Sequence, residues 1–275
     1  MPTPSDDGDT SRNDAHRLSV RDCLYGAFAP LLLRIRRGEG VLLAIVASVA
    51  ARERGGPLKS GLAIALCTLV MAAMYLHNDR VDARRDRSNP RKDRRLSALL
   101  SRYDLAFAVL HGVALPALTA ALWLVCGARA GASAAGCMLV NVAYSRWFKG
   151  IPLIDVLVVG TWGAAFAAII DASIGRVVVV WLMTAISHVF QARLDRTSDE
   201  RSGVNTTAVA SPGLSIALIG LLGLLLAAWT NRRVGHLVSA LGVAPLVACL
   251  LPNRAAGWIL AKAAFAVLWI AYLVS

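Results

Sequence analysis

The sequence predicts an all-α polytopic membrane protein. Of its 275 residues, 57% are hydrophobic, and the mean hydropathy is +0.58. Apolar runs of about 15 to 22 residues alternate with short charged loops, and runs of this length suit helices that cross a bilayer. The net charge is +12, but the basic residues gather in loops on one side of the apolar runs, as a membrane topology requires. With no base-reading motif in view, we predict membrane lipid and no nucleic acid as a partner.

The N-terminal part is expected to remain outside the bundle. Residues 1–21 are rich in Asp, Ser, Thr and Asn, lack apolar periodicity, and have no apolar centre like that of a signal peptide. We therefore predict a disordered leader over 1–21 and one transmembrane domain over 22–275. Residues 23–33 are apolar but too short to span, so they are expected to lie along the membrane interface. The first span is centred on residues 41–51.

Eight further spans are predicted after the polar loop that follows residue 51. They are 61–76, 105–125, 130–144, 153–170, 177–191, 214–229, 237–251 and 255–274. With the N-terminus inside, 21 of the 29 Lys and Arg residues fall on the inner side and seven on the outer side. This bias predicts a multi-pass protein of the inner cell membrane with a cytoplasmic N-terminus. The five cysteines are scattered and mostly lie inside apolar runs, so they are interpreted as small buried hydrophobes.

A group of carboxylates follows directly on the span 61–76. If that helix continues, Asp79, Asp82 and Asp86, at i, i+3 and i+7, share one face where the helix meets water. Carboxylates crowded on one face repel each other unless a hard cation such as Mg²⁺ lies among them. The alternative is a solvated charge run that serves only as a positive-inside flank.

A second pair, Asp195 and Asp199 at i, i+4, ends another apolar run about 110 residues later. The predicted topology places it on the same cytoplasmic side as the first group. Asn-Asp-x-x-Asp-x-x-x-Asp over 78–86, followed by Asp-x-x-x-Asp, resembles the UbiA superfamily of intramembrane prenyltransferases. Residues 89–96 and 195–209 are similar to the segments around the two family motifs, and Gly203 and Thr206 keep the family spacing behind Asp199.

This resemblance implies a nine-helix bundle with a central cavity capped on the cytoplasmic side. Two or more Mg²⁺ ions would bridge the Asp motifs and an isoprenyl diphosphate, whose prenyl group passes to a small acceptor, expected to be aromatic. By motif position, the metal residues are Asn78, Asp79, Asp82, Asp86, Asp195 and Asp199. The residues with a catalytic role are Asp79, Asp82, Asp195, Asp199 and Arg94. The residues that contact the diphosphate are Arg94, Lys149, Arg85 and Arg201.

The chain departs from the family pattern after Arg94. Many relatives continue as Arg-Pro-Leu-Pro-Ser-Gly, whereas this chain continues through residues 95–99 without Pro or Gly, so the lid over the diphosphate is expected to differ in shape. Among polar residues inside spans, His188 is expected to border the cavity more readily than His111. The walls that could stabilise a cation are Trp147, Trp162 and Trp181.

Two other functions compete with prenyl transfer. A UbiA-type terpene cyclase would ionise the same diphosphate and close the cation on itself without an acceptor. A cation transporter would use the Asp clusters as a permeation site. Transport is disfavoured because the clusters lie at helix ends, whereas transporters bind their ions near the bilayer midplane.

Overall fold

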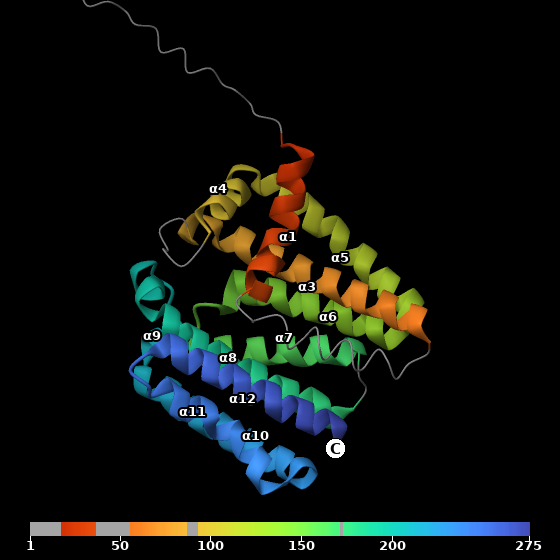
Figure 1. Ribbon diagram of the computed structural model, residues 1–275. Coiled ribbons are helices and arrows are strands. Elements are labelled where there is room, and N and C mark those ends of the chain that lie inside the picture. The colour runs from red at the N-terminus through yellow and green to blue at the C-terminus, as the bar shows by residue number, and fades with distance from the viewer. Residues whose placement is uncertain (1–17, 37–55, 87–92, 171–172) are drawn as a thin grey trace, which may run out of the picture.

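The computed structural model describes residues 18–36, 56–86, 93–170 and 173–275, which form helices and their connecting segments. Figure 1 shows the long helices packed side by side in a single bundle. Consecutive long helices are neighbours from α3 to α10, and α12 packs against α8, α10 and α11. The helices are α1 (Val20–Arg36), α3 (Pro57–Asp86), α4 (Arg94–Arg102), α5 (Asp104–Cys126), α6 (Ala128–Ala143), α7 (Ile154–Ile170), α8 (Ile174–Arg201), α9 (Thr207–Ala210), α10 (Pro212–Ser239), α11 (Ala244–Cys249) and α12 (Arg254–Val274).

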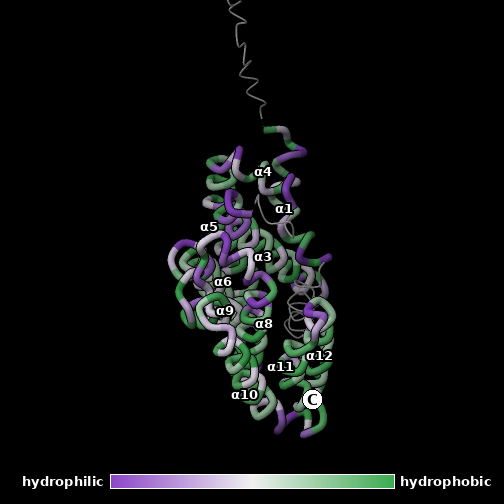
Figure 2. The backbone as a smooth tube through the Cα atoms, turned by 90° about the vertical axis from the view of Figure 1, so that its left-hand side faces the viewer, coloured by the Kyte–Doolittle hydropathy of each residue, from purple (hydrophilic) through white to green (hydrophobic). Residues whose placement is uncertain are grey.

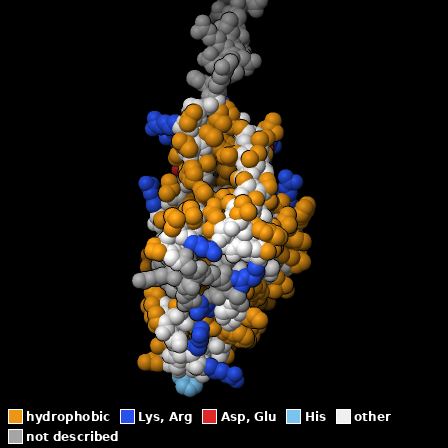
Figure 3. Space-filling view, turned by 90° about the vertical axis from the view of Figure 1, so that its right-hand side faces the viewer, with side chains coloured by type: hydrophobic (Ala, Val, Ile, Leu, Met, Phe, Trp, Pro, Cys, Tyr) orange, Lys and Arg blue, Asp and Glu red, His pale blue; other side chains and the backbone are white. Residues whose placement is uncertain are grey.

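The surface and the helix lengths identify an integral membrane protein. Hydrophobic side chains cover most of the face in Figure 3, and Leu124, for example, is 84% exposed. Along the backbone, apolar segments predominate in α10 to α12, whereas hydrophilic segments gather near α1 and α4 (Figure 2). Within the described ranges, five helices are long and apolar enough to cross a bilayer, and Ile154–Ile170 is a shorter apolar helix. The five are Pro57–Asp86, Asp104–Cys126, Ile174–Arg201, Pro212–Cys249 and Arg254–Val274.

The all-helical fold is confirmed, while nine spans remain a prediction. The span 41–51 lies outside the described residues, as does the predicted leader up to residue 17. The helix α1 begins at Val20, inside the last residues of that leader, and is longer than the expected apolar stretch 23–33. The predicted spans from 61–76 to 214–229 and the last, 255–274, each coincide with one helix to within a few residues at their apolar parts.

The predicted span 237–251 is not one regular α-helix. Within the residues assigned to α10, Gly235 has a φ of 78°, which breaks the helix at that point. The chain then continues as the end of α10, a 3₁₀ turn at Ala240–Val243 and the short α11. The 3₁₀ turn packs very close to α10: a Cβ on Gly223 of α10 would lie 2.8 Å from the carbonyl oxygen of Gly242.

Two helices extend beyond the apolar layer. The 30 residues of α3 span about 45 Å, and the 28 residues of α8 are nearly as long. The hydrocarbon core of a bilayer is only about 30 Å thick. Each helix therefore continues past its apolar part, which confirms that α3 runs unbroken through Asp79, Asp82 and Asp86.

The helix α4 packs on the polar end of α3 through a small hydrophobic cluster that is separate from the main core. Its N-cap Asp93 accepts the Leu96 N–H at 3.1 Å and the Tyr25 hydroxyl at 2.9 Å. Burial, and then the hydrogen bond to Asp93, raise the pKa of Tyr25, so this hydroxyl stays protonated and donates. Leu96 and Leu100 pack with Ala83 and other apolar side chains from α1, α3 and α5. These contacts position the chain on both sides of residues 87–92, which are themselves outside the described ranges.

We predict that Gly257→Ala weakens the packing of α12 on α11. The new Cβ would lie 2.2 Å from the carbonyl oxygen of Ala248, a backbone atom that can move only with its helix. Overpacking of this kind costs about 1–3 kcal/mol, measurable as a lower unfolding temperature in detergent. The matched control is Gly136→Ala in α6, where nothing lies within 4 Å of the new Cβ. Equal stability of the two variants would contradict the close approach at Gly257.

Candidate active site

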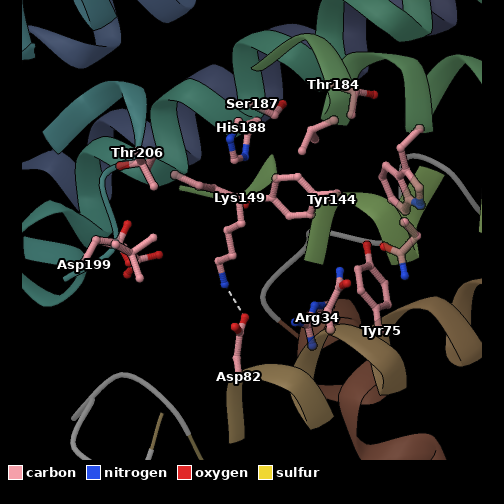
Figure 4. A pocket seen from close by; sticks show the side chains of 18 of the residues that line it. Arg34, Tyr75, Asp82, Tyr144, Lys149, Thr184, Ser187, His188, Asp199 and Thr206 are labelled. Atoms are coloured by element: carbon pink, nitrogen blue, oxygen red, sulfur yellow. Dashed lines mark hydrogen bonds and ion pairs between the residues drawn. The ribbon is translucent and has the colours of Figure 1, made fainter. Parts of the chain in front are cut away.

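A cavity of 290 Å³ opens between the polar ends of α3 and α8. Its walls come from α3, α7, α8 and the turn that follows α6. Arg34 of α1 and Trp269 of α12 also line it. Both Asp motifs reach it, since Asp82 and Asp199 belong to its lining. Figure 4 shows these two side chains on different sides of Lys149. The predicted meeting of the two motifs is thus seen in the fold.

The first motif divides between the cavity and α1. Asn78, Asp82 and Asp86 line the cavity, as their spacing of four residues along α3 allows. Asp79 is absent from the lining and instead forms a bidentate ion pair with Arg34, with N–O distances of 2.7 and 2.5 Å. The guanidinium of Arg34 also lies 4.3 Å from the centre of the Tyr75 ring. Asp79 therefore joins α3 to α1 through Arg34, which is itself a cavity residue.

The carboxylate of Asp82 is compensated by two basic side chains. It is 7% exposed and bonds Arg85 through one oxygen and Lys149 through the other. Arg85 belongs to the next turn of the same helix, but Lys149 follows the π-helix Tyr144–Phe148 and is 67 residues away. A π-helical turn is a rare backbone form that often occurs at functional sites. Here the π-helical turn connects α6 to Lys149, whose ammonium group contacts Asp82.

Hydrogen bonds fix the same turn against α3. Ser145 donates its hydroxyl to Asn78, and the Asn141 amide donates to the carbonyl of Met74 at 3.1 Å. The oxygen of Asn78 and the carboxylate of Asp82 are therefore both held by residues after the predicted fourth span. Tyr144 lies in this turn and also lines the cavity.

The second motif lies on the last turns of α8. Asp195 and Asp199 line the cavity together with Ser198 and Ser202. The helix ends at Arg201, and two residues later Gly203 has a φ of 71°, a conformation that glycine adopts without steric cost. The N–H of Val204 then bonds back to the carbonyl of Asp199 at 2.9 Å, which brings Val204 and Thr206 into the lining.

The chain that carries these two motifs is similar to a known family and to solved structures. The model of the UbiA prenyltransferase family matches residues 41–274. The chain belongs to this family. No curated protein sequence matches the chain at a significant level. Among solved structures, a UbiA homolog from Archaeoglobus fulgidus bound to GPP and Mg²⁺ is similar, with a TM-score of 0.61 and 16% identity over 91% of this chain and 99% of that one.

A second similar structure is a UbiA homolog from the same organism bound to DMAPP and Mg²⁺. It has a TM-score of 0.60 and 18% identity, covering 91% of this chain and 98% of the other. At these identities the likeness concerns the fold. The UbiA fold is thus shared over nearly the whole length of these chains.

The oxygen donors of this UbiA family member suit a hard cation. Facing walls of the cavity carry the carboxylates of both motifs and the amide of Asn78, the ligand types that Mg²⁺ prefers. Over the described ranges, no three Asp, Glu, His or Cys side chains are close enough together to hold a metal on their own.

Of the other predicted residues, some line the cavity and others do not. Arg94 and Arg201 are exposed, at the start of α4 and the end of α8. His188 and Trp162 line the cavity, whereas Trp147, Trp181 and His111 do not. His111 packs on His77 instead, with ring centres 4.6 Å apart. The segment 89–92 of the first family motif is outside the described residues.

Several lining residues escaped the sequence reasoning. Tyr75 lies one turn before Asp79, a spacing that could have placed it at the cavity, and Tyr144 precedes the recognised Lys149 by five residues. Trp269 comes from the last helix, far from either motif, and no local pattern indicates it. Tyr75, Tyr144 and Trp269, together with Trp162, are the aromatic side chains of the lining, and the part of the cavity that they line is called its aromatic end.

We predict that Arg34→Ala destabilises the protein more than Arg80→Ala. Arg34 and Asp79 have side chains only 16% and 12% exposed, so losing this pair removes two short, partly buried bonds. The expected cost is about 1–3 kcal/mol, with partial recovery in Arg34→Lys, because one ammonium cannot make the bidentate contact. Arg80 is 10% exposed, but it makes a single contact of 2.8 Å with Asp104, which is 53% exposed, so loss of this ion pair should cost below about 1 kcal/mol. Thermal unfolding in detergent measures both, and the reverse order would contradict this ranking.

Proposed function

We propose that the chain is a magnesium-dependent intramembrane prenyltransferase that ionises an isoprenyl diphosphate and transfers the prenyl group to a small aromatic acceptor. One observation carries the proposal: carboxylates of two distant motifs, three basic side chains and several aromatic side chains share one cavity. Membership of the UbiA prenyltransferase family and the ligands of the similar structures support it. The polar end suits a diphosphate and the aromatic end suits a hydrocarbon.

The polar end supplies the groups for binding and leaving-group stabilisation. Asn78, Asp82, Asp86, Asp195 and Asp199 would hold Mg²⁺, with Asp79 supporting them through its bond to Arg34. When bound, Mg²⁺ supplies positive charge next to the diphosphate, which weakens the C–O bond to the allylic carbon. Lys149 and Arg85 would bind phosphate oxygens directly, since both belong to the cavity lining.

The aromatic end would receive the prenyl chain. Tyr75, Tyr144, Trp162 and Trp269 present ring surfaces that stabilise a nearby cation and keep water away from it. The same lining would also serve a cyclase, in which the cation is attacked by a double bond of its own chain. Cyclisation is therefore the second candidate, and it differs from transfer by needing no acceptor.

We expect turnover to require Mg²⁺ or Mn²⁺ and to fall by about 10²-fold or more in Asp82→Ala and in Asp195→Ala. Each change removes a carboxylate from one wall of the cavity. Diphosphate release from purified protein measures turnover, with and without excess chelator. Asp104→Asn, a carboxylate on the surface outside the cavity, is the matched control and should keep wild-type turnover. Full activity in chelator, or in an Asp82→Ala plus Asp195→Ala double variant, would rule out the metal assignment.

Among the basic residues, we expect Lys149→Ala and Arg85→Ala to raise the KM for prenyl diphosphate most. Both side chains already lie at the cavity and contact Asp82. Arg94 and Arg201 remain proposed diphosphate partners, but they would have to turn from the surface into the cavity, so their Ala variants should be milder. Arg129→Ala, an exposed site at the start of α6, is the control. A larger KM change in Arg94→Ala than in Lys149→Ala would reverse this order.

Product analysis should separate transferase from cyclase. Purified protein is incubated with geranyl, farnesyl or geranylgeranyl diphosphate and Mg²⁺, with and without aromatic acids. We expect prenyl diphosphate to be consumed in an acceptor-dependent way, giving a product whose mass is the sum of acceptor and prenyl group less one hydrogen. A cyclic hydrocarbon or terpene alcohol formed at an undiminished rate without acceptor would show a cyclase.

A further inference from the structure

A buried carboxylate outside both Asp motifs adjoins the aromatic end of the cavity. Asp155, in the first turn of α7, is 0% exposed. One of its oxygens accepts the N–H of Val156 at 2.9 Å and the hydroxyl of Thr207, and the other accepts the N–H of Thr207 at 3.0 Å. Two backbone N–H groups and a hydroxyl thus point at this carboxylate. Such a donor set holds it as an acceptor in a fixed orientation.

An imidazole lies between this carboxylate and the cavity. The Nε2 atom of His188 is 3.5 Å from the second oxygen of Asp155, and it has no closer hydrogen-bond partner. His188 lines the cavity, with 12% of its side chain exposed, and the Tyr144 ring packs edge-on against it with centres 5.8 Å apart. Figure 4 shows His188 beside Ser187, above Lys149 and Tyr144, whereas Asp82 lies on the opposite side of Lys149.

The neighbouring carboxylate favours one tautomer of the neutral imidazole. Since an ionised Asp155 can only accept, the neutral ring would present its Nε2–H to that carboxylate, which leaves an unshared electron pair on Nδ1. A contact of 3.5 Å is long for a hydrogen bond, but such bonds in catalytic groups are often long outside the substrate complex. An oriented histidine with a carboxylate behind it is an arrangement that can accept a proton and stabilise the resulting charge.

The position of His188 suits the hydrocarbon and not the diphosphate. It precedes Asp195 by seven residues on the same helix, which is about 10 Å along the axis. Thr184, Gln191 and Asp195 also line the cavity from α8, so His188 lies on the stripe that leads inward from the metal-binding end. The aromatic side chains Tyr144 and Trp162 line the same part of the cavity.

Prenyl transfer to an aromatic carbon needs a base at its end. The C–O bond of the allylic diphosphate breaks and its electron pair leaves with the diphosphate. A π pair of the acceptor ring then forms the new C–C bond, and the ring carries the positive charge. The C–H pair at the attacked carbon returns to the ring as its proton departs, which restores aromaticity and needs no oxidant.

We propose that Nδ1 of His188 takes this proton and that Asp155 positions the imidazole for the task. The assignment rests on the proposed function, because it requires a carbocation in the cavity. It applies equally to a cyclase that forms a hydrocarbon, where the proton leaves the carbon next to the final cation. His188 is then a catalytic residue and Asp155 a positioning residue.

The test follows ionisation and product formation separately in His188→Gln. Diphosphate release should stay within about threefold of wild type, whereas prenylated product should fall by about 10²-fold, the usual contribution of a general base. Prenyl alcohol, formed when water captures the cation, should take its place. With a ring-deuterated acceptor, the remaining product should form more slowly than with the ordinary acceptor, because loss of the ring proton has become the slow step.

Two further variants separate a chemical role from a structural one. Asp155→Asn should raise the ratio of alcohol to prenylated product in the same direction as His188→Gln, while a loss of packing alone would lower all products together. The matched control is His111→Gln, a buried histidine that is outside the cavity lining and should keep the wild-type product ratio. Elution as a single species in detergent, together with diphosphate release, verifies folding of each variant.

The outcomes distinguish this assignment from the proposed function. If wild type releases diphosphate and His188→Gln makes prenylated product at the wild-type rate, the assignment is overturned and the proposed function stands. If wild-type protein releases no diphosphate from any allylic substrate, the proposed function is overturned and the assignment with it. A parallel loss of diphosphate release and product in both variants would show that the pair serves packing, which also overturns the assignment.

Discussion

The pairing of Asp82 with Lys149 and Arg85 is the constraint around which the polar end of the bundle is built. A carboxylate that is 7% exposed at the edge of a membrane is costly unless opposite charges accompany it. Lys149 can reach Asp82 only because the chain after α6 passes through a π-helical turn held to α3 by Ser145 and Asn141. A substrate phosphate would offer the two cations a second anionic partner at the same place. Electrostatic compensation of the protein and recognition of the substrate therefore use the same side chains.

Helix length explains why such a site lies at the membrane boundary. Because α3 and α8 are longer than the hydrocarbon layer is thick, each carries an apolar segment and a charged end in one rigid element. An isoprenyl diphosphate has the same division, with a charged head and an apolar tail. The cavity between these helices can hold both parts without unfolding either helix. An ion-transport site would instead be expected near the bilayer midplane and not at the charged ends of two helices.

Asp155 connects the two halves of the site. Its bonds to Thr207 hold the chain just after Thr206, so the segment that closes the second motif is attached to α7. The hydroxyl of Thr207 also accepts the N–H of Leu153 at 2.7 Å, which fixes the turn before α7. One buried carboxylate thus sets the place of the motif loop and faces His188. This coupling means that changes at Asp155 have to be judged by product ratios as well as by stability.

The sequence by itself determined the helical membrane fold, most of the helix positions and the family. Apolar runs of membrane length are a local property, and Asp79, Asp82, Asp86, Asp195 and Asp199 form patterns that can be read without coordinates. The helical spacing predicted one shared face for Asp79, Asp82 and Asp86, but only Asp82 and Asp86 line the cavity. Tertiary structure decided which member of a motif faces which partner: Asp79 turns to Arg34, and Asp82 takes Lys149. It also placed Trp269 in the lining and His188 next to Asp155, and it divided the predicted span 237–251 into the end of α10, a 3₁₀ turn and α11. These features depend on contacts between helices far apart in the chain, and periodicity within one helix carries no information about the helix that will pack against it.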